Sequence, residues 1–468
     1  MSAVVPMPVV RPMVGRRSAA ARRREDLLGR VHLAVRMARR SLKRALAEEE
    51  GAATGAPGGG GAPAPLVLAK VVGEAAMLLR MAASLRGEDE TLDVESRLLA
   101  VQLVAPARGA RVKARLCHDT GRALEHASAH LFLGDAGYPD EAFDRLLDEL
   151  LEGEVAGGAE RLPNHQLECE WLDQLRRGRV GVEPIDAELL AATCIGWPLD
   201  VLACSTLDLY MFTHVVLYAS DMGRRPVRLP RPVDEVLAEA EAGLAAALDA
   251  DNFDLAAELL WTWPMLDRPW SAAAAFAFDL LSTVQDEFGF LPGPEHARWA
   301  AEPVPGLARD EVVLRTSYHA TLVMGMLCAA ALRPGAAPPA AIASRASLVP
   351  PSSRGMPAPF MSSASLASPP RRDAAPVGDT GWLARLPPRA PTPRWQQAFE
   401  QLDASRQAAL TSLCFNVWFR RAAAGDLAQL REALAGTLEH GSGDGPSARQ
   451  ALMRLRRTTA VARSGPPA

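Results

Sequence analysis

The sequence lacks most of the motifs by which soluble enzymes are identified. Its 468 residues contain no GxxxxGK[ST] phosphate loop, no convincing GxGxxG after a strand, no GxSxG elbow, and no DDxxD or DxDD run. The six cysteines include no CxxC pair, so no disulfide framework is implied and free thiols in a reducing cytoplasm are expected. These absences leave the reaction and any cofactor unassigned.

Isoleucine is also scarce, and the charges are nearly balanced. Isoleucine occurs only at Ile185, Ile195 and Ile342, whereas alanine, leucine, arginine and glutamate dominate. That mixture favours helix over strand and predicts an all-α protein. A net charge of -4 gives no general case for nucleic acid or membrane binding, and no specific nucleic-acid signal is found.

No apolar run is long and uninterrupted enough to predict a membrane span. The longest apolar segment, Ala191 to Gly223, is broken by Pro198, Asp200 and Asp208. A bilayer would penalise each of the two aspartates by roughly 3 kcal/mol, so a buried core helix is the better interpretation. The twin arginine at 16–17 is followed by more arginine, not by an apolar region, and we expect a cytoplasmic protein.

Composition divides the chain into five segments. We expect a basic arm and amphipathic helix at 1–50, a glycine-rich linker at 51–65, and a central helical domain at 66–333. A disordered Pro/Ser/Ala-rich linker at 334–392 and a C-terminal helical segment at 393–460 follow. The basic N-terminal helix and the C-terminal helices could bind a protein partner, although a solvated basic face is the simpler interpretation.

Within the central domain, helical patterns follow one another with short Gly, Pro and Asp breaks. The expected helices are 66–86, 93–104, 109–133, 139–152, 162–177, 185–195, 200–222, 232–249, 252–263, 270–288 and 309–332. Paired helices with short turns predict stacked hairpins, which close into an α/α toroid or stay open as a solenoid. No fixed repeat period is found, and this favours the toroid.

A polar row on the segment Ala191 to Gly223 is the first candidate site. His214 has Tyr210 one helical turn before it, Tyr218 one turn after it, and Asp221 two turns on. We interpret His214 as a candidate base with Asp221 as its orienting partner, and the two tyrosines as hydrogen-bonding walls. The alternative is a core histidine within a satisfied polar network.

A second apolar helix carries Arg315 and His319, four residues apart. If this helix and the His214 helix line one cavity, the two histidines share it and Arg315 suits an anionic ligand. Trp263, in a tryptophan-rich stretch, could contact a ligand, although core packing is the simpler interpretation. Local hydrogen bonding is the alternative for His319.

His126 and His130 have the i, i+4 spacing of two metal ligands on one helix face. The sequence HASAH lacks the glutamate of an HExxH metalloprotease helix, so ordinary surface or packing histidines are favoured. We therefore assign no metal ligand from the sequence.

Three further stretches carry a resemblance. Residues DLYMFTHVVLYASDMG (208–223), WTWPML (261–266) and QDEFGFLPGP (285–294) resemble an uncharacterised helical family of high-GC, actinobacterial-type bacteria found near natural-product genes. The resemblance covers about residues 160–332, and Tyr-x-x-Thr-His is its most specific element. It implies a genomic setting and no particular reaction.

A wider similarity is to the α/α toroids of terpenoid cyclases and protein prenyltransferases. Residues 285–291 are similar to their Gln-x-x-x-Gly-x-Trp turn, with Leu291 in place of the tryptophan, and the acidic motifs of the cyclases are absent. Fold similarity does not transfer function. We expect an accessory or tailoring protein of secondary metabolism that binds a small molecule or peptide in a central cavity; the alternative is a non-catalytic scaffold that binds a protein.

Overall fold

The computed structural model describes residues 18–53, 64–153, 160–301, 308–339 and 392–425. Their regular structure is helical, which confirms the all-α prediction; an isolated bridge between Val180 and Glu183 is the one β interaction described. The first helices are α1 (Ala19–Ala53), α2 (Leu68–Ala83), α3 (Glu90–Arg108), α4 (Ala110–His118), η1 (Thr120–Arg122), α5 (Ala123–Asp135), α6 (Glu141–Leu151), α7 (Pro163–Arg176), α8 (Ala187–Ala192) and η3 (Cys194–Gly196). The later ones are α9 (Thr206–Ser220), α10 (Val233–Asp249), α11 (Phe253–Met265), α12 (Ala272–Phe288), α13 (His296–Ala301), α14 (Arg309–Ala331), α15 (Arg394–Glu400), α16 (Ala404–Ala409) and α17 (Thr411–Gly425).

Side-chain caps fix where the helices around the centre of the molecule begin. Ser205 and Asp208 form a reciprocal capping box at the start of α9, and the side chain of Asn252 accepts a hydrogen bond from the backbone N–H of Leu255 at the start of α11. At the end of α9, Asp221 adopts a left-handed conformation with φ 49°. The polar row of this segment is therefore cut before Asp221, which lies outside the helix.

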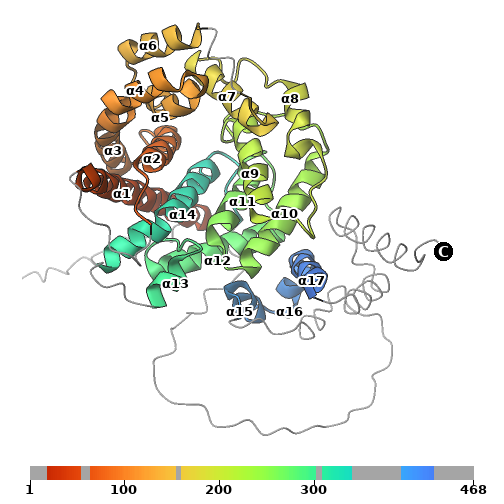
Figure 1. The fold of residues 1–468 in the computed structure, drawn as a ribbon. Coiled ribbons are helices and arrows are strands. Elements are labelled where there is room, and N and C mark those ends of the chain that lie inside the picture. The colour runs from red at the N-terminus through yellow and green to blue at the C-terminus, as the bar shows by residue number, and fades with distance from the viewer. Residues whose placement is uncertain (1–17, 54–63, 154–159, 302–307, 340–391, 426–468) are drawn as a thin grey trace, which may run out of the picture.

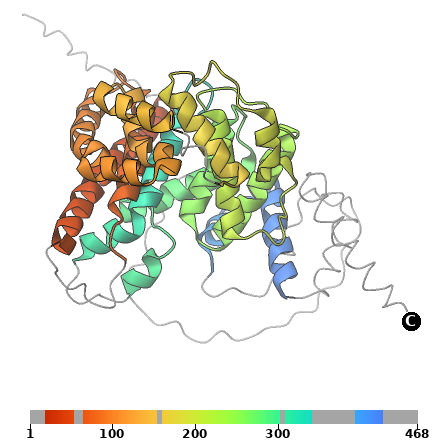
Figure 2. The same cartoon turned by 45° about the horizontal axis from the view of Figure 1, so that its top comes forward.

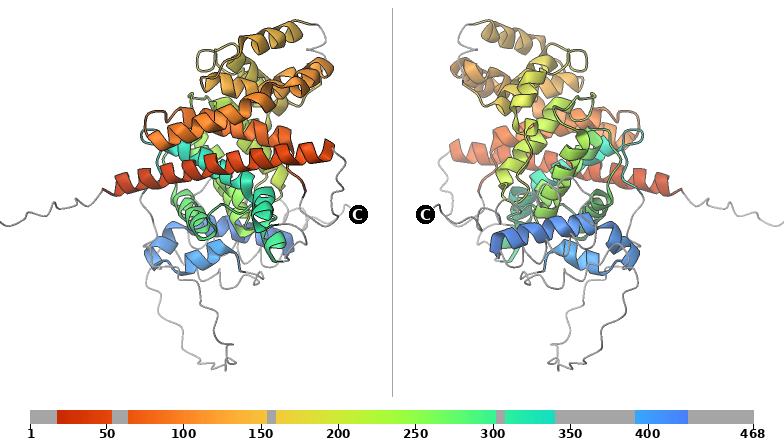
Figure 3. Two further views of the ribbon diagram at one scale, coloured as in Figure 1. Left: turned by 90° about the vertical axis from the view of Figure 1, so that its left-hand side faces the viewer. Right: turned by 90° about the vertical axis from the view of Figure 1, so that its right-hand side faces the viewer.

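The long helix α1 packs along α14 and α2 and is part of the helical core, although the sequence suggested a separate N-terminal segment (Figures 1 and 3). Val31, Val35 and Leu42 on its inner face are fully buried. Gly325 of α14 lies so close to α1 that an added Cβ atom would stand 2.2 Å from the Cβ of Ala34. Glycine is thus needed for the close approach of these two helices.

Helix α11 lies at the centre of the molecule, and all 13 of its residues are buried. It packs against α14 on one side and against α9 and α10 on others, and α14 in turn packs against α2. In Figure 1, α11 lies between α14 and α10, and Figure 2 shows the red and orange N-terminal helices on one side of the green central helices. Polar side chains on α2, α9, α11 and α14 can therefore meet inside the core.

The C-terminal helices α15 and α17 dock onto the surface of α10. The indole N–H of Trp395 donates to Asp249 over 3.2 Å, and Arg421 forms two further bonds with the same carboxylate. Most of the predicted 334–392 linker and the end of the expected C-terminal segment lie outside the described residues. The closure of the hairpins into a toroid stays a prediction.

Among the described residues, α14 is the one helix long and apolar enough to cross a membrane. In the fold, 78% of its apolar window is buried inside the molecule. Its apolar surface is thus covered by other helices, as in the core helix of a globular domain.

Candidate functional site

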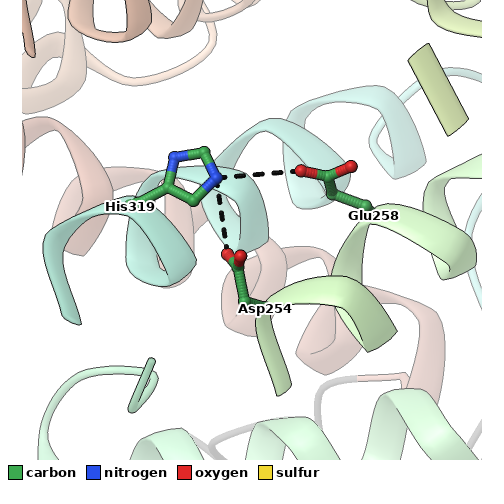
Figure 4. Close-up of side chains that lie close together, drawn as sticks. All are labelled: Asp254, Glu258 and His319. Carbon is green, nitrogen blue, oxygen red and sulfur yellow. Dashed lines mark ion pairs between the residues drawn. The ribbon is translucent and has the colours of Figure 1, made fainter. Parts of the chain in front are cut away.

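Three side chains from the two central helices form a compact cluster, which we call the Asp254 centre: Asp254, Glu258 and His319 (Figure 4). The two acids are four residues apart on α11, and this spacing places them on one face of the helix, toward α14. The Nε2 atom of His319 lies 3.5 Å from Oδ1 of Asp254 and 3.7 Å from Oε1 of Glu258. Both distances exceed that of a normal hydrogen bond.

The opposite side of the His319 ring faces a third carboxylate. An oxygen of Glu74, on α2, lies 3.0 Å from Nδ1 of His319. Burial alone would raise the pKa of Glu74, but the charges of His319 and Lys70 and a hydrogen bond from Tyr318 lower it. Glu74 is therefore held as a carboxylate, beside the edge of the imidazole that faces away from the Asp254 centre.

Helix α9 supplies the outer hydrogen bonds of the two central acids. The hydroxyl of Tyr210 donates to Oδ2 of Asp254 over 2.8 Å, and that of Thr213 donates to Oε2 of Glu258 over 2.7 Å. His214 lies beside the same acid, with Nε2 3.7 Å from Oε2 of Glu258. Tyr210 and His214, two members of the predicted polar row, thus face the Asp254 centre.

Tyr218, one turn further along α9, belongs to the neighbouring pair with Glu168 of α7. Burial raises the pKa of the Glu168 carboxyl, and the nearby charge of Glu125 raises it further. Burial and the charge of Glu168 likewise raise the pKa of Tyr218 well above its usual value. The Tyr218 ring also lies 6.0 Å from that of His214, so it lines the same polar region.

The electrostatics of the Asp254 centre combine burial with close opposite charges. Burial disfavours the imidazolium, but the carboxylates of Asp254 and Glu74 outweigh it and raise the pKa of His319 well above its usual value. Burial and the charge of Glu258 raise the pKa of Asp254. For Glu258 itself, the opposing effect of burial is outweighed by the two histidines and the bond from Thr213, which lower its pKa.

The exposure of these side chains shows from where solvent reaches the centre. The side chains of Asp254 and Glu258 are 7% and 8% exposed, whereas those of His319 and His214 are 28% and 37% exposed. The histidines therefore border the accessible side, with the acids behind them. Three carboxylates and two imidazoles at one place suit a positively charged ligand, a metal ion or proton transfer.

Several predicted roles do not fit this geometry. The pairing of Asp221 with His214 is wrong, because the carboxylate of Asp221 accepts bonds from Arg80 and from the indole of Trp171. Arg315 pairs with Glu48 at 2.7 Å, so this cation is engaged within the protein and does not form the expected anion site.

The remaining predicted residues are engaged in packing. The indole ring of Trp263 is buried and stacks on that of Trp270. His126 pairs with Asp119, and buried His130 accepts a bond from Arg108 and donates to Asp144. A guanidinium directed at Nδ1 of His130 occupies the lone pair that a metal would need, so the packing interpretation fits both histidines better than a metal pair.

Glu74, Asp254 and Glu258 were not predicted as site residues, although the sequence pattern around two of them indicates a buried polar site. Asp254 and Glu258 stand at i and i+4 in FDLAAELLWTW, a helix that is otherwise almost wholly apolar. Two acids on one face of a buried helix require partners, as the predicted polar row on α9 does. Glu74, one acid in a mixed helix, carried no such signal.

Comparisons with known proteins place the chain in a family. No curated protein and no solved structure matches it. Residues 35–329, which span α2 to α13 with parts of α1 and α14 and hold every member of the Asp254 centre, match the family described as Domain of unknown function (DUF6895). Because the match covers more than half of the chain, the protein belongs to this family.

Proposed function

We propose that the protein binds a positively charged small molecule or ion at the Asp254 centre, as an accessory or tailoring protein of bacterial secondary metabolism that acts in the cytoplasm. The supporting observation is the meeting of three carboxylates and two imidazoles from α2, α9, α11 and α14 within one family domain. The resemblance to a family found near natural-product genes supports the setting. The excess of carboxylates favours a cationic ligand over the anionic one first expected.

His214 is the group to test first, because it is the more exposed of the two histidines and borders the buried acids. Native mass spectrometry of the purified protein, compared with its denatured mass, should reveal a retained ligand. In His214→Ala we expect a retained organic cation to be lost while the melting temperature stays within a few degrees, since a partly exposed side chain contributes little to packing. Undiminished retention of the same organic ligand by the variant would contradict the proposal.

The alternative function is a non-catalytic scaffold, and one surface feature favours it. Val94, Leu98 and Val101 lie on one face of α3 and are 46%, 45% and 72% exposed. Apolar side chains in such a row are typical of protein contacts. If copies of the chain contact one another through this face, the protein should self-associate in sedimentation velocity and Val101→Lys should abolish the association. A monomeric protein would contradict this alternative.

A further inference from the structure

We propose that Asp254, Glu258 and His319 bind one divalent transition-metal ion of the Mn(II), Fe(II) or Zn(II) class. The inference rests on the proposed function, because it identifies the bound cation at the same centre. One ligand atom of each residue lies within 4.8 Å of those of the other two, and Nε2 of His319 faces Oδ1 of Asp254 and Oε1 of Glu258.

The distances at the centre are those of atoms around a shared ion. Such metals hold oxygen and nitrogen ligands at about 2.0–2.2 Å, so neighbouring ligand atoms on a tetrahedral ion are about 3.3–3.6 Å apart. The distances from Nε2 of His319 to the two carboxylates, 3.5 Å and 3.7 Å, are close to that value. A direct charged hydrogen bond would bring the same atoms to about 2.8 Å.

A buried atom that accepts no hydrogen bond also points to a ligand. Oδ1 of Asp254 accepts no hydrogen bond, although the residue is only 5% exposed. Its partner oxygen, Oδ2, is bonded to Tyr210. A buried carboxylate oxygen without a hydrogen bond is costly, and a metal ion would satisfy it.

Each of the three ligands is also held from behind, at the atom that does not face the others. Tyr210 bonds Oδ2 of Asp254 and Thr213 bonds Oε2 of Glu258. Glu74 lies 3.0 Å from Nδ1 of His319, so its negative charge lies on the side of the imidazole opposite Nε2. This carboxylate–histidine arrangement is the usual support of a histidine that binds a metal.

The donor atoms select the class of metal. Two carboxylate oxygens and one imidazole nitrogen suit manganese, iron or zinc, whereas calcium and magnesium prefer sites made of oxygen alone and copper(I) prefers sulfur. Three protein ligands leave at least one position for water or substrate, as in catalytic metal sites. The partly exposed side of His319 gives access to that position.

The test is metal uptake by the full-length protein. The chelator-treated protein is dialysed against MnCl2, FeCl2 without oxygen, or ZnCl2, with MgCl2 and CaCl2 as comparisons, and bound metal is measured by mass spectrometry. We expect one equivalent of at least one transition metal, with Asp254→Asn and His319→Ala each weakening binding by more than about 100-fold. Tyr210→Phe, which keeps every ligand, should weaken it by about 10- to 100-fold.

His126→Ala is the matched control, because it removes a histidine that pairs with an aspartate away from the centre. It should leave uptake unchanged; loss of uptake in this variant, with intact circular dichroism, would place the metal at His126 and overturn the inference. Absence of stoichiometric uptake, or uptake that survives Asp254→Asn and His319→Ala with intact circular dichroism, would also overturn it. If an organic cation is retained at the centre and no metal is, the metal inference fails while the proposed function stands.

Discussion

Two clusters of buried charge contact α9, and they differ in how completely their hydrogen bonds are made. In the Asp221 cluster, formed by Arg80, Asp135, Trp171 and Asp221, the Asp221 carboxylate accepts from the Trp171 indole over 2.7 Å and from Arg80 over 3.0 Å. The Nε atom of Arg80 donates to Asp135 over 2.8 Å. In the Asp254 centre, by contrast, a buried carboxylate oxygen accepts no hydrogen bond.

This difference separates a structural role from a binding role. A buried ion pair that is fully hydrogen-bonded is a closed unit, and removing one partner leaves the other charge without compensation. A centre whose atoms face one another without direct hydrogen bonds between them leaves room for a ligand among them. The sequence predicted Asp221 and His214 in a single row. In the structure, Asp221 belongs to the fully hydrogen-bonded cluster, whereas His214 lies beside Glu258 of the Asp254 centre.

The largest expected effect comes from breaking the Asp221 cluster. Asp221→Asn should lower the free energy of unfolding by about 3–5 kcal/mol, because it leaves the fully buried Arg80 with one carboxylate fewer. Urea unfolding followed by circular dichroism measures this loss. A loss below about 1 kcal/mol would show that the cluster is not a closed structural unit.

A smaller effect should follow from removing a single donor of the same cluster. Trp171→Phe keeps the aromatic packing against Phe132 and Tyr218 but removes the indole N–H that bonds Asp221. We expect a loss of about 1.5–3 kcal/mol, the usual contribution of a hydrogen bond to a charged group. In the Asp221→Asn background the same substitution should cost less, and a double-mutant cycle would reveal this coupling.

A third satisfied cluster predicts a pH dependence of stability. Burial lowers the pKa of His130, which accepts a bond from Arg108 at Nδ1 and donates one to Asp144 at Nε2. The unfolded chain therefore takes up the proton first as the pH falls below about 6.5. The stability is complete above that pH and decreases below it by at most about 1.4 kcal/mol per pH unit.

His130→Gln isolates this contribution, because glutamine does not titrate. The difference in unfolding free energy between the unmodified protein and the variant should shrink from pH 7.5 to pH 5.5. A difference that is constant over this range would mean that His130 is not held in its neutral form.

Helix positions were predictable because each depends on a local pattern. The expected helix at 309–332 is observed as Arg309–Ala331, and that at 232–249 as Val233–Asp249. The expected single helix at 109–133 is broken at Asp119, where the chain forms a short 3₁₀ turn before α5. Local periodicity does not record such a break, because both halves keep helical spacing.

The site was predictable only in part, for a different physical reason. His214, His319 and Tyr210 stood out as polar side chains on apolar helices, and all three contact the Asp254 centre or belong to it. The carboxylates that they contact, on α2 and α11, are at least 44 residues away from them along the chain. Such pairings are set by how the helices pack, and a single sequence does not encode them in any local pattern.

The smallest expected effect on stability completes the comparison. Asp254→Asn makes the same chemical change as Asp221→Asn, but in the metal-free protein it should lower the free energy of unfolding by less than about 1.5 kcal/mol, because Glu74 still pairs with His319 after the Asp254 charge is removed. Burial and Glu258 already raise the pKa of Asp254, which means that the fold disfavours its charge, and asparagine can still accept the bond from Tyr210. Chelator-treated samples of the two variants are compared by urea unfolding in one buffer. A loss as large as that of Asp221→Asn would mean that the Asp254 centre is a second structural ion cluster, because only a closed network loses that much when one charge is removed.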